Sequence, residues 1–307
     1  MACRARRCCG AAGVTAIERG VPLAKLTTIG TGGPARAFAR PRTVAELGDA
    51  LRLARNDGLD VFVVGLGSNV LAADAGVDGL VLRLEGELAA VDVVDAALHA
   101  GGGATNAVCL HRARDAGLGG FEFACAIPGT AGGGVYMNAG AYGSDWSEVL
   151  VRALVVSAEG ESWRTPDELG LSYRQSALLP GEVVARVEYR LEPRPPAEIK
   201  ATIADLVARR KETQPTNKRT FGSVFKNPPG DLGAGRMLEL CGLKGHRIGG
   251  AQISPKHANF IENTGTATSA DCVALLVEAR RRAHAEYGME LEHEVVFAGV
   301  PELAPIT

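Results

Sequence analysis

The sequence predicts an α+β protein of more than one domain, and three observations carry that prediction. The chain has 307 residues, which is longer than the size at which a single hydrophobic core usually stops growing. Segments with a helical period alternate with short β-branched runs through the first two thirds of the chain. A Pro-rich stretch, Glu192-Pro193-Arg194-Pro195-Pro196, then marks a boundary. We therefore expect mixed helix and strand lobes followed by a separate C-terminal domain.

The first helix is expected to run from Thr43 to Gly58. Thr43 can cap it, with Glu46 as its capping-box partner, and glycine disfavours its continuation. A second unit of the same kind begins near Val91. The expected strands are 61–64, 80–84, 153–157 and 183–191, and the next helix is 105–117. The expected divisions are a disordered extension (1–20), two lobes (21–90 and 91–196) and a C-terminal domain (197–307).

Two helices are expected after the Pro-rich boundary. One carries Ile199, Ile203, Leu206, Val207 and Arg210 at helical spacing and ends before Gln214-Pro215. The other spans residues 270–287 and stops at Gly288.

Charge and cysteine content restrict the classes of partner. Lys+Arg of 33 against Asp+Glu of 35 gives a formal charge of −2, too weak a field to gather nucleic acid or an anionic membrane. Seven cysteines without a C-x-x-C pair indicate neither a disulfide framework nor a zinc site, and Cys3, Cys8 and Cys9 lack the neighbours that would complete a metal ligand set. No apolar run approaches a membrane span or a secretory signal. We expect a soluble, cytoplasmic, monomeric protein that acts on small molecules without a metal.

Glycine clusters point to phosphate binding. The chain has 39 glycines, above the average usage of about 7%. Four patches stand out: Gly30-Thr31-Gly32-Gly33, Gly65-Leu66-Gly67-Ser68-Asn69, Gly101-Gly102-Gly103 and Gly129-Thr130-Ala131-Gly132-Gly133-Gly134. Any one patch can be a tight turn. Four together favour backbone N–H groups that converge on phosphate oxygens, and a dinucleotide cofactor suits them.

The familiar phosphate and catalytic motifs are missing. Val70 and Asn106 stand where a dinucleotide fingerprint would need its third glycine. The sequence has no Gly-Lys dipeptide, no H-E-x-x-H and no G-x-S-x-G. The phosphate site must therefore belong to another fold.

Longer motifs show a resemblance. TTIGTGGPA at 27–35, GLGSN at 65–69 and AIPGTAGGGVYMNAGAYG at 126–143 are followed by SYRQS at 172–176, GSVFKNP at 222–228, GLKG at 242–245, GGAQISPKHANFIEN at 249–263 and LEHEV at 291–295. In this order they resemble the UDP-N-acetylenolpyruvoylglucosamine reductase family over nearly everything after residue 25, and the short chain looks like its second type. Members of that family catalyse the last step in the formation of UDP-N-acetylmuramate, a precursor for peptidoglycan synthesis.

The resemblance implies a vanillyl-oxidase/PCMH-like FAD-binding fold of two α+β lobes with a C-terminal α+β domain for the substrate. It also implies noncovalent FAD and NADPH as cofactors and UDP-N-acetylglucosamine enolpyruvate as substrate. Gly134 replaces a usual alanine in the third motif, which we expect to leave room for the cofactor. The residues that match the family's FAD site are Thr31, Gly65, Gly67, Ser68, Asn69, Ile127, Pro128, Gly129, Thr130, Gly132, Gly133 and Asn138.

Three residues match the family's chemistry. Ser223 would protonate the substrate carbon after hydride transfer. Arg174 would hold the substrate carboxylate through its rigid fork. Glu294 would act in its protonated form, which requires a raised pKa. Substrate contacts are expected from Tyr173, Lys226, Asn227 and Lys256.

Several alternatives stay open. Glu292 lies two positions from Glu294 and would share its face in a strand. Ser223 could be a turn residue, Arg174 a structural ion-pair partner, and Lys256 a solvated cation. His257 is expected to be structural. An oxidase with the same flavin fold, or a nucleotide-sugar sensor without catalysis, would not need Arg174, Ser223 and Glu294 together.

Overall fold

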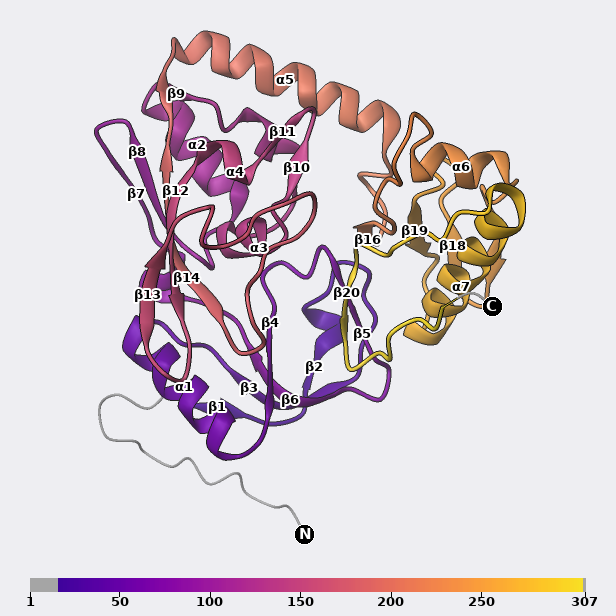
Figure 1. The fold of residues 1–307 in the computed structure, drawn as a ribbon, viewed down its shortest axis with the longest axis horizontal. Helices are drawn as coiled ribbons and strands as arrows, with labels where there is room; N and C mark the ends of the chain where they lie inside the picture. Colours follow the sequence, from indigo (N-terminus) through magenta and orange to yellow (C-terminus); the bar gives the residue numbers. More distant parts are fainter. Residues whose placement is uncertain (1–15, 306–307) are drawn as a thin grey trace.

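The computed structural model describes residues 16–305. The three largest sheets, each with its own helices, stand around a common centre, and Figure 1 shows their chain order from indigo through magenta to yellow. The two N-terminal sheets lie below and to the left of that centre, and the C-terminal part lies to the right. None of the helices formed by residues 16–305 is long and apolar enough to span a membrane.

The first lobe is a twisted sheet of order β1-β3-β6-β4, with β2 also paired to β3. Strands β3, β6 and β4 run parallel, as expected where a helix connects them. Thr43 caps helix α1 by accepting from the Glu46 amide at 3.1 Å, but the Glu46 carboxylate accepts from Arg42 N instead. The elements are β1 (Ile17–Glu18), β2 (Val21–Pro22), η1 (Leu23–Lys25), β3 (Pro34–Ala39), α1 (Val44–Asn56), β4 (Asp60–Val63), β5 (Val70–Ala72) and β6 (Val77–Leu82).

The first sheet begins before residue 20, the expected end of the N-terminal extension. Ile17 and Glu18 pair with Ala39 and Phe38 in the first sheet. The rest of that extension, including Cys3, Cys8 and Cys9, lies outside the described residues.

The second lobe is an antiparallel sheet of order β13-β12-β14-β8-β7. Its core holds an aromatic cluster in which the fully buried Trp146 donates from Nε1 to the Tyr189 hydroxyl at 2.8 Å. The elements are η2 (Gly86–Ala89), β7 (Val91–Val94), β8 (Ala97–Gly101), α2 (Asn106–Asp115), β9 (Leu118–Gly119), η3 (Glu122–Ala126), α3 (Ala131–Tyr136), β10 (Gly140–Ala141), β11 (Ser144–Asp145), α4 (Trp146–Val149), β12 (Leu150–Val156), β13 (Glu161–Arg164) and β14 (Val183–Arg190).

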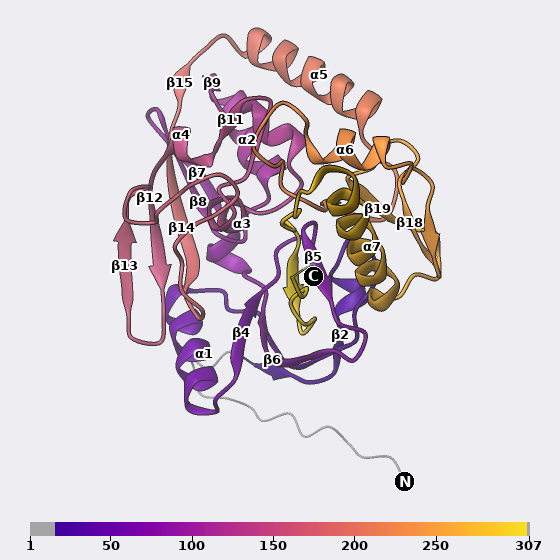
Figure 2. The ribbon, with the colours of Figure 1, turned by 45° about the vertical axis from the view of Figure 1, so that its right-hand side comes forward.

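The Pro-rich boundary is a short strand followed by a long helix. Strand β15 (Glu192–Pro193) pairs with β9, and α5 (Pro196–Thr213) then crosses the outside of the second lobe toward the C-terminal sheet (Figures 1 and 2). Proline at the first helical position fits its missing N–H.

The C-terminal part is an antiparallel sheet of order β16-β19-β18-β17 covered by two helices. Thr268 and Asp271 form a capping box at the start of α7, and Gly288 ends it in the left-handed region with φ 63°. The elements are β16 (Thr220–Ser223), α6 (Ala234–Leu240), β17 (Arg247–Ile248), β18 (Ala251–Ile253), β19 (Phe260–Asn263), α7 (Ser269–Tyr287) and β20 (Val296–Ala298).

The C-terminal part is joined to the first lobe by more than the chain. Strand β20 lies parallel to β5 of the first lobe, with Val296 opposite Val70 (Figure 1). Ile29 and Leu71 of the first lobe are fully buried in the C-terminal core. The parts expected as 21–90 and 197–307 therefore share a strand pair and a core.

Candidate active site

A cavity of about 970 Å³ lies where the three parts meet. This volume is at the upper end of the ~300–1,000 Å³ of small-molecule sites. Its walls include the loop 65–69 of the first lobe, the segment 126–134 of the second, and Ser223 and Glu294 of the C-terminal part. Ten of the residues expected to bind FAD line it: Gly65, Gly67, Ser68, Asn69, Ile127, Pro128, Gly129, Thr130, Gly132 and Gly133.

Several of these glycines are needed because two loops approach closely. A Cβ on Gly65 would lie 2.7 Å from the Thr130 hydroxyl oxygen. Gly67 has φ +65°, and a Cβ there would lie 2.0 Å from the Leu26 carbonyl oxygen. A Cβ on Gly132 would press on backbone at 2.9 Å. The glycines let these segments approach closely, and they leave backbone exposed along part of the cavity wall.

A buried side-chain oxygen in Asn106, without a hydrogen-bond partner among the described residues, indicates that this wall suits a polar ligand. Asn106 is 2% exposed and donates from Nδ2 to the Ile127 carbonyl at 3.0 Å. Its Oδ1 is buried without a hydrogen-bond partner among residues 16–305, and the residue lines the cavity. Buried polar atoms are nearly always hydrogen-bonded in native proteins. A long ligand with donors and phosphates, such as FAD, fits this combination of an unpartnered acceptor and glycine-rich loops.

Gly134 has a different role from the one expected. It lines the cavity, but a Cβ there would lie 2.3 Å from Cε2 of the Trp146 indole ring. The missing side chain therefore accommodates Trp146 behind α3, and the expectation that it makes room for the cofactor is not what the packing shows.

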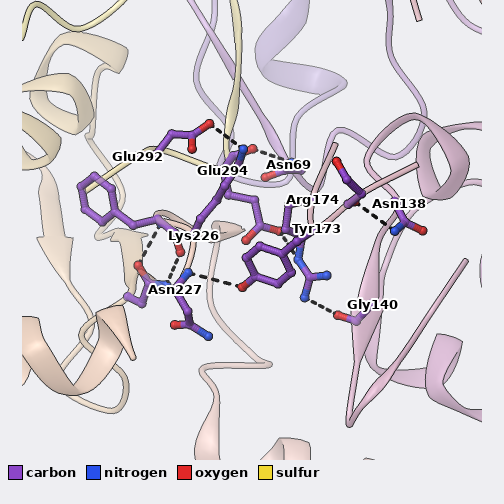
Figure 3. A network of polar contacts seen from close by, with 12 residues as sticks. Asn69, Asn138, Gly140, Tyr173, Arg174, Lys226, Asn227, Glu292 and Glu294 are labelled. Carbon is purple, nitrogen blue, oxygen red and sulfur yellow. Dashed lines mark hydrogen bonds and ion pairs between the residues drawn. The ribbon is translucent and has the colours of Figure 1, made fainter. Parts of the chain in front are cut away.

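Arg174 enters the cavity from a tight turn in the second lobe. Ser172 and Gln175 exchange backbone hydrogen bonds at 3.0 and 3.1 Å, and Arg174 between them has φ 56°. A non-glycine residue in this region costs on the order of 1–3 kcal/mol. Its Nη2 donates to the Gly140 carbonyl at 2.7 Å, and its Nε lies 3.1 Å from Glu294 Oε1 (Figure 3). The guanidinium is thus held along one edge by two partners.

Backbone pairing brings Ser223 and Glu294 together. The Glu294 amide donates to the Val224 carbonyl at 2.8 Å, directly after Ser223. Asn69 of the first lobe donates from Nδ2 to the Glu294 carbonyl at 3.1 Å (Figure 3). Gly222, with φ +83°, turns the chain beside the Ser68 carbonyl. The Ser223 hydroxyl has no hydrogen-bond partner within residues 16–305, so it is available to a ligand.

The structure separates the two candidate carboxylates. The Glu294 side chain is 19% exposed and faces Arg174 in the cavity. The Glu292 side chain is 69% exposed and pairs outside the cavity with Lys226 at 2.5 Å. They do not share a strand face because 290–295 is not a strand. Burial raises the pKa of Glu294 above its usual range, although Arg174 and Lys226 act in the opposite direction.

Three residues expected to contact substrate lie beside the cavity wall. Lys226 is close enough to Glu294 to lower its pKa while bonded to Glu292. The Tyr173 hydroxyl accepts from the Asn227 amide at 3.4 Å (Figure 3). The Asn227 side-chain oxygen accepts a hydrogen bond from the backbone N–H of Ala234, the first residue of α6.

Three other expected residues lie away from the cavity. Lys256 is exposed, and its ammonium donates to the Lys211 carbonyl at the end of α5. Thr31 is 3% exposed and bonds to Ser269 Oγ at 2.9 Å. Asn138 is 2% exposed and donates to the Ser172 carbonyl at 3.0 Å, so it supports the turn that carries Arg174. His257 packs edge-on against Phe260 and accepts from Asn259 N, as a structural histidine does.

The sequence interpretation missed Asn106, Tyr142 and Arg210, all of which line the cavity. Arg210 carried a usable signal, because it is a charged residue at a position in register with the apolar stripe of α5.

Comparisons with known proteins agree with this geometry. Residues 35–166 match the family model of an FAD binding domain, and residues 214–298 match that of the C-terminal domain of UDP-N-acetylenolpyruvoylglucosamine reductase. Together with the cavity, they define an FAD-binding flavoprotein with an added C-terminal domain.

Whole-chain relatives make the assignment specific. UDP-N-acetylenolpyruvoylglucosamine reductase 2 of Symbiobacterium thermophilum is 44% identical over 285 residues, 92% of each chain. The Rubrobacter xylanophilus reductase is 42% identical, over 91% of this chain and 94% of its own. The crystal structure of the Thermus caldophilus reductase superposes with a TM-score of 0.81 at 37% identity, over 92% of this chain and 99% of that one. This chain belongs to the UDP-N-acetylenolpyruvoylglucosamine reductase family.

Proposed function

We propose that this chain uses FAD and NADPH to reduce UDP-N-acetylglucosamine enolpyruvate to UDP-N-acetylmuramate, for peptidoglycan synthesis. One observation supports it above the others: Arg174 and Glu294 are in contact at 3.1 Å in a cavity that an unpartnered Ser223 hydroxyl also lines. A flavin-fold oxidase or a sensor would not require that arrangement. FAD, when bound along loops 65–69 and 127–133, supplies the hydride acceptor and donor.

Arg174 binds the substrate carboxylate. Its contacts with Gly140 and Glu294 hold one edge of the guanidinium and leave the rest available to a second carboxylate. Negative charge grows next to that carboxylate when hydride reaches the terminal carbon of the enolpyruvyl group. A fixed cation aimed at such charge acts as an oxyanion hole does, at about 3 kcal/mol for each donor.

Glu294 works as a hydrogen-bond donor in its neutral form. Burial already raises its pKa. A substrate carboxylate on Arg174 neutralises part of the charge that opposes this rise, so substrate binding raises the pKa further. The neutral acid can then donate to the carboxylate oxygens of the substrate as their charge grows.

Ser223 supplies the proton. The Oγ–H bond breaks and a C–H bond forms at the carbon beside the carboxylate, and solvent later restores the serine proton. The transfer is favourable because the acceptor carbon is carbanion-like, which compensates for the weak acidity of a hydroxyl. Lys226, Asn227 and Tyr173 are proposed to contact the nucleotide sugar at the edge of the cavity.

Separate half-reactions test the assignment. Ser223→Ala should leave flavin reduction by NADPH intact and slow reoxidation by the enolpyruvyl substrate by about 10²–10⁴-fold, as loss of a positioned proton donor does. Stopped-flow flavin absorbance measures both, with the surface variant Ser157→Ala as control. Equal slowing of both half-reactions, or of neither, contradicts the role of Ser223. Rapid reoxidation by air without substrate indicates an oxidase instead.

A further inference from the structure

Arg210 is a cation in the cavity without an anion. It lies in the last turn of α5 and lines the cavity together with Gln214 and Ile127. Its Nε is buried and has no hydrogen-bond partner among residues 16–305. No carboxylate of the described residues lies within 4.0 Å of its guanidinium, the distance that defines an ion pair.

Two other sheltered arginines are paired with carboxylates. Arg174 has Glu294. Arg164 has Glu182 at 2.5 Å. The titratable groups that affect the pKa of Arg210 are Tyr142 and Cys125, and both are largely neutral near pH 7. Burial lowers the pKa of Arg210, although an arginine stays charged in proteins. A sheltered guanidinium with no partner is costly, and an anionic ligand removes that cost.

The helix is held so that Arg210 cannot easily turn away. The Tyr142 hydroxyl donates to the Leu206 carbonyl at 3.1 Å, one turn before Arg210. Arg209 lies over the Tyr142 ring at 4.9 Å. Cys125, whose thiol Arg210 influences, directly precedes the loop from Ala126 that lines the cavity. Arg210 is therefore fixed beside the glycine loop of the second lobe.

We propose that Arg210 binds a diphosphate group in this cavity. A planar guanidinium matches two phosphate oxygens, and the neighbouring loops offer backbone instead of competing carboxylates. The inference rests on the proposed function for the identity of its ligands, because FAD and the UDP-sugar substrate both carry a diphosphate. The chemistry is shared, and binding measurements distinguish the two sources.

Two titrations without turnover test it. In the first, cofactor-free protein is titrated with FAD and, separately, with riboflavin, and quenching of flavin fluorescence is followed. In the second, FAD-loaded protein is titrated with UDP and with uridine, and the flavin absorbance change is followed. The variants are Arg210→Gln and Arg210→Lys. Lys211→Gln, an exposed neighbour that does not line the cavity, is the matched loss of one charge.

Arg210→Gln should weaken the binding of at least one diphosphate by about 10- to 100-fold, as loss of charge-assisted hydrogen bonds does. Riboflavin and uridine should bind as to wild type, and Arg210→Lys should recover part of the loss. Weaker FAD binding alone assigns the cofactor diphosphate, weaker UDP binding alone assigns the substrate diphosphate, and weaker binding of both assigns a shared role. Unchanged affinity for both overturns the proposal, as does an equal loss for the phosphate-free ligands.

The outcome is independent of the reductase assignment. Wild-type protein that binds FAD and UDP but does not reduce the enolpyruvyl substrate refutes the proposed function and leaves the Arg210 result in place. Normal turnover by Arg210→Gln, with unchanged affinities, refutes only the role of Arg210. Thermal unfolding of each cofactor-free variant shows whether a loss reflects a damaged fold.

Discussion

Arg174→Lys measures how much the two-pronged guanidinium of Arg174 contributes to the substrate half-reaction, because the substitution keeps the positive charge. Arg174 donates to Gly140 O at 2.7 Å and lies 3.1 Å from Glu294 Oε1. A lysine ammonium at the end of a single stem can satisfy one of these partners while it also meets the substrate carboxylate. One charge-assisted hydrogen bond is then lost, at about 1.5–3 kcal/mol. This corresponds to about a 10- to 150-fold slower oxidation of the flavin by substrate.

The same variant changes the pH dependence in a defined direction. Arg174 lowers the pKa of Glu294 against the larger effect of burial. A lysine in less direct contact lowers it less, so the pKa rises further. Because the neutral carboxyl is the working form, the rate of the substrate half-reaction falls as pH rises through that pKa. The falling limb should therefore move to higher pH in Arg174→Lys.

Stopped-flow absorbance at a series of pH values measures both effects. Flavin reduction by NADPH should be unaffected, since it needs no acid at the substrate carbon. Arg36→Lys is the matched control, because Arg36 makes an exposed ion pair with Asp78 at 2.8 Å and such pairs contribute little. A limb that moves to lower pH, or equal slowing of both half-reactions, refutes the reasoning.

Three further predictions follow from the same site. Glu294→Gln should abolish the falling limb of the pH profile of flavin reoxidation because an amide does not ionise, and Glu292→Gln should keep it; the reverse result assigns the catalytic carboxylate to Glu292. Gly134→Ala should lower the urea unfolding free energy of cofactor-free protein by about 1–2 kcal/mol, because overpacking against Trp146 outweighs the gain in helix propensity; an unchanged midpoint contradicts this. NADPH and substrate should give parallel double-reciprocal plots, since both must reach one flavin, and intersecting plots would show a ternary complex.

Local signals predicted the helices well. Thr43 begins α1, Gly288 ends α7, and Pro215 follows the end of α5, each because a cap or a missing N–H acts within a few residues. The pairing of Val70 with Val296 had no such signal. Contact between residues so distant in sequence depends on the whole fold. The sequence therefore contained no sign that the first lobe and the C-terminal part share a strand pair.

The candidate site also has parts that local sequence signals located and parts that they did not. The glycine loops at 65–69 and 127–133 were located by their composition and motifs, and they line the cavity. The patch at Gly30–Gly33 has similar composition but serves packing, since a Cβ on Gly33 would lie 2.2 Å from the Asp74 carbonyl. Composition cannot separate a glycine that faces a ligand from one that faces backbone. Thr31, which the motif suggests for the cofactor, is buried and hydrogen-bonded to Ser269.

Charged residues show a related limit. Lys256 was expected at the substrate because its motif and charge suit a phosphate, yet its ammonium bonds to the end of α5. Arg210 was grouped with an apolar helix face, yet it reaches the cavity. A long side chain has several carbonyls and ligands within reach, and only the packed neighbours decide among them.

The shared core of the first and last parts has a consequence for synthesis on the ribosome. Ile29 and Leu71 emerge early, but they are buried against residues such as Phe221 and Leu275. Translation at about 5–20 residues per second separates their appearance by on the order of ten seconds or more. During that interval the nascent first lobe exposes apolar side chains and the unpaired edge of β5, to which chaperones or other chains can bind. Glu294, which lines the cavity, directly precedes β20, the strand that pairs with this edge, so the cavity is completed only when the first lobe gains its last strand pair.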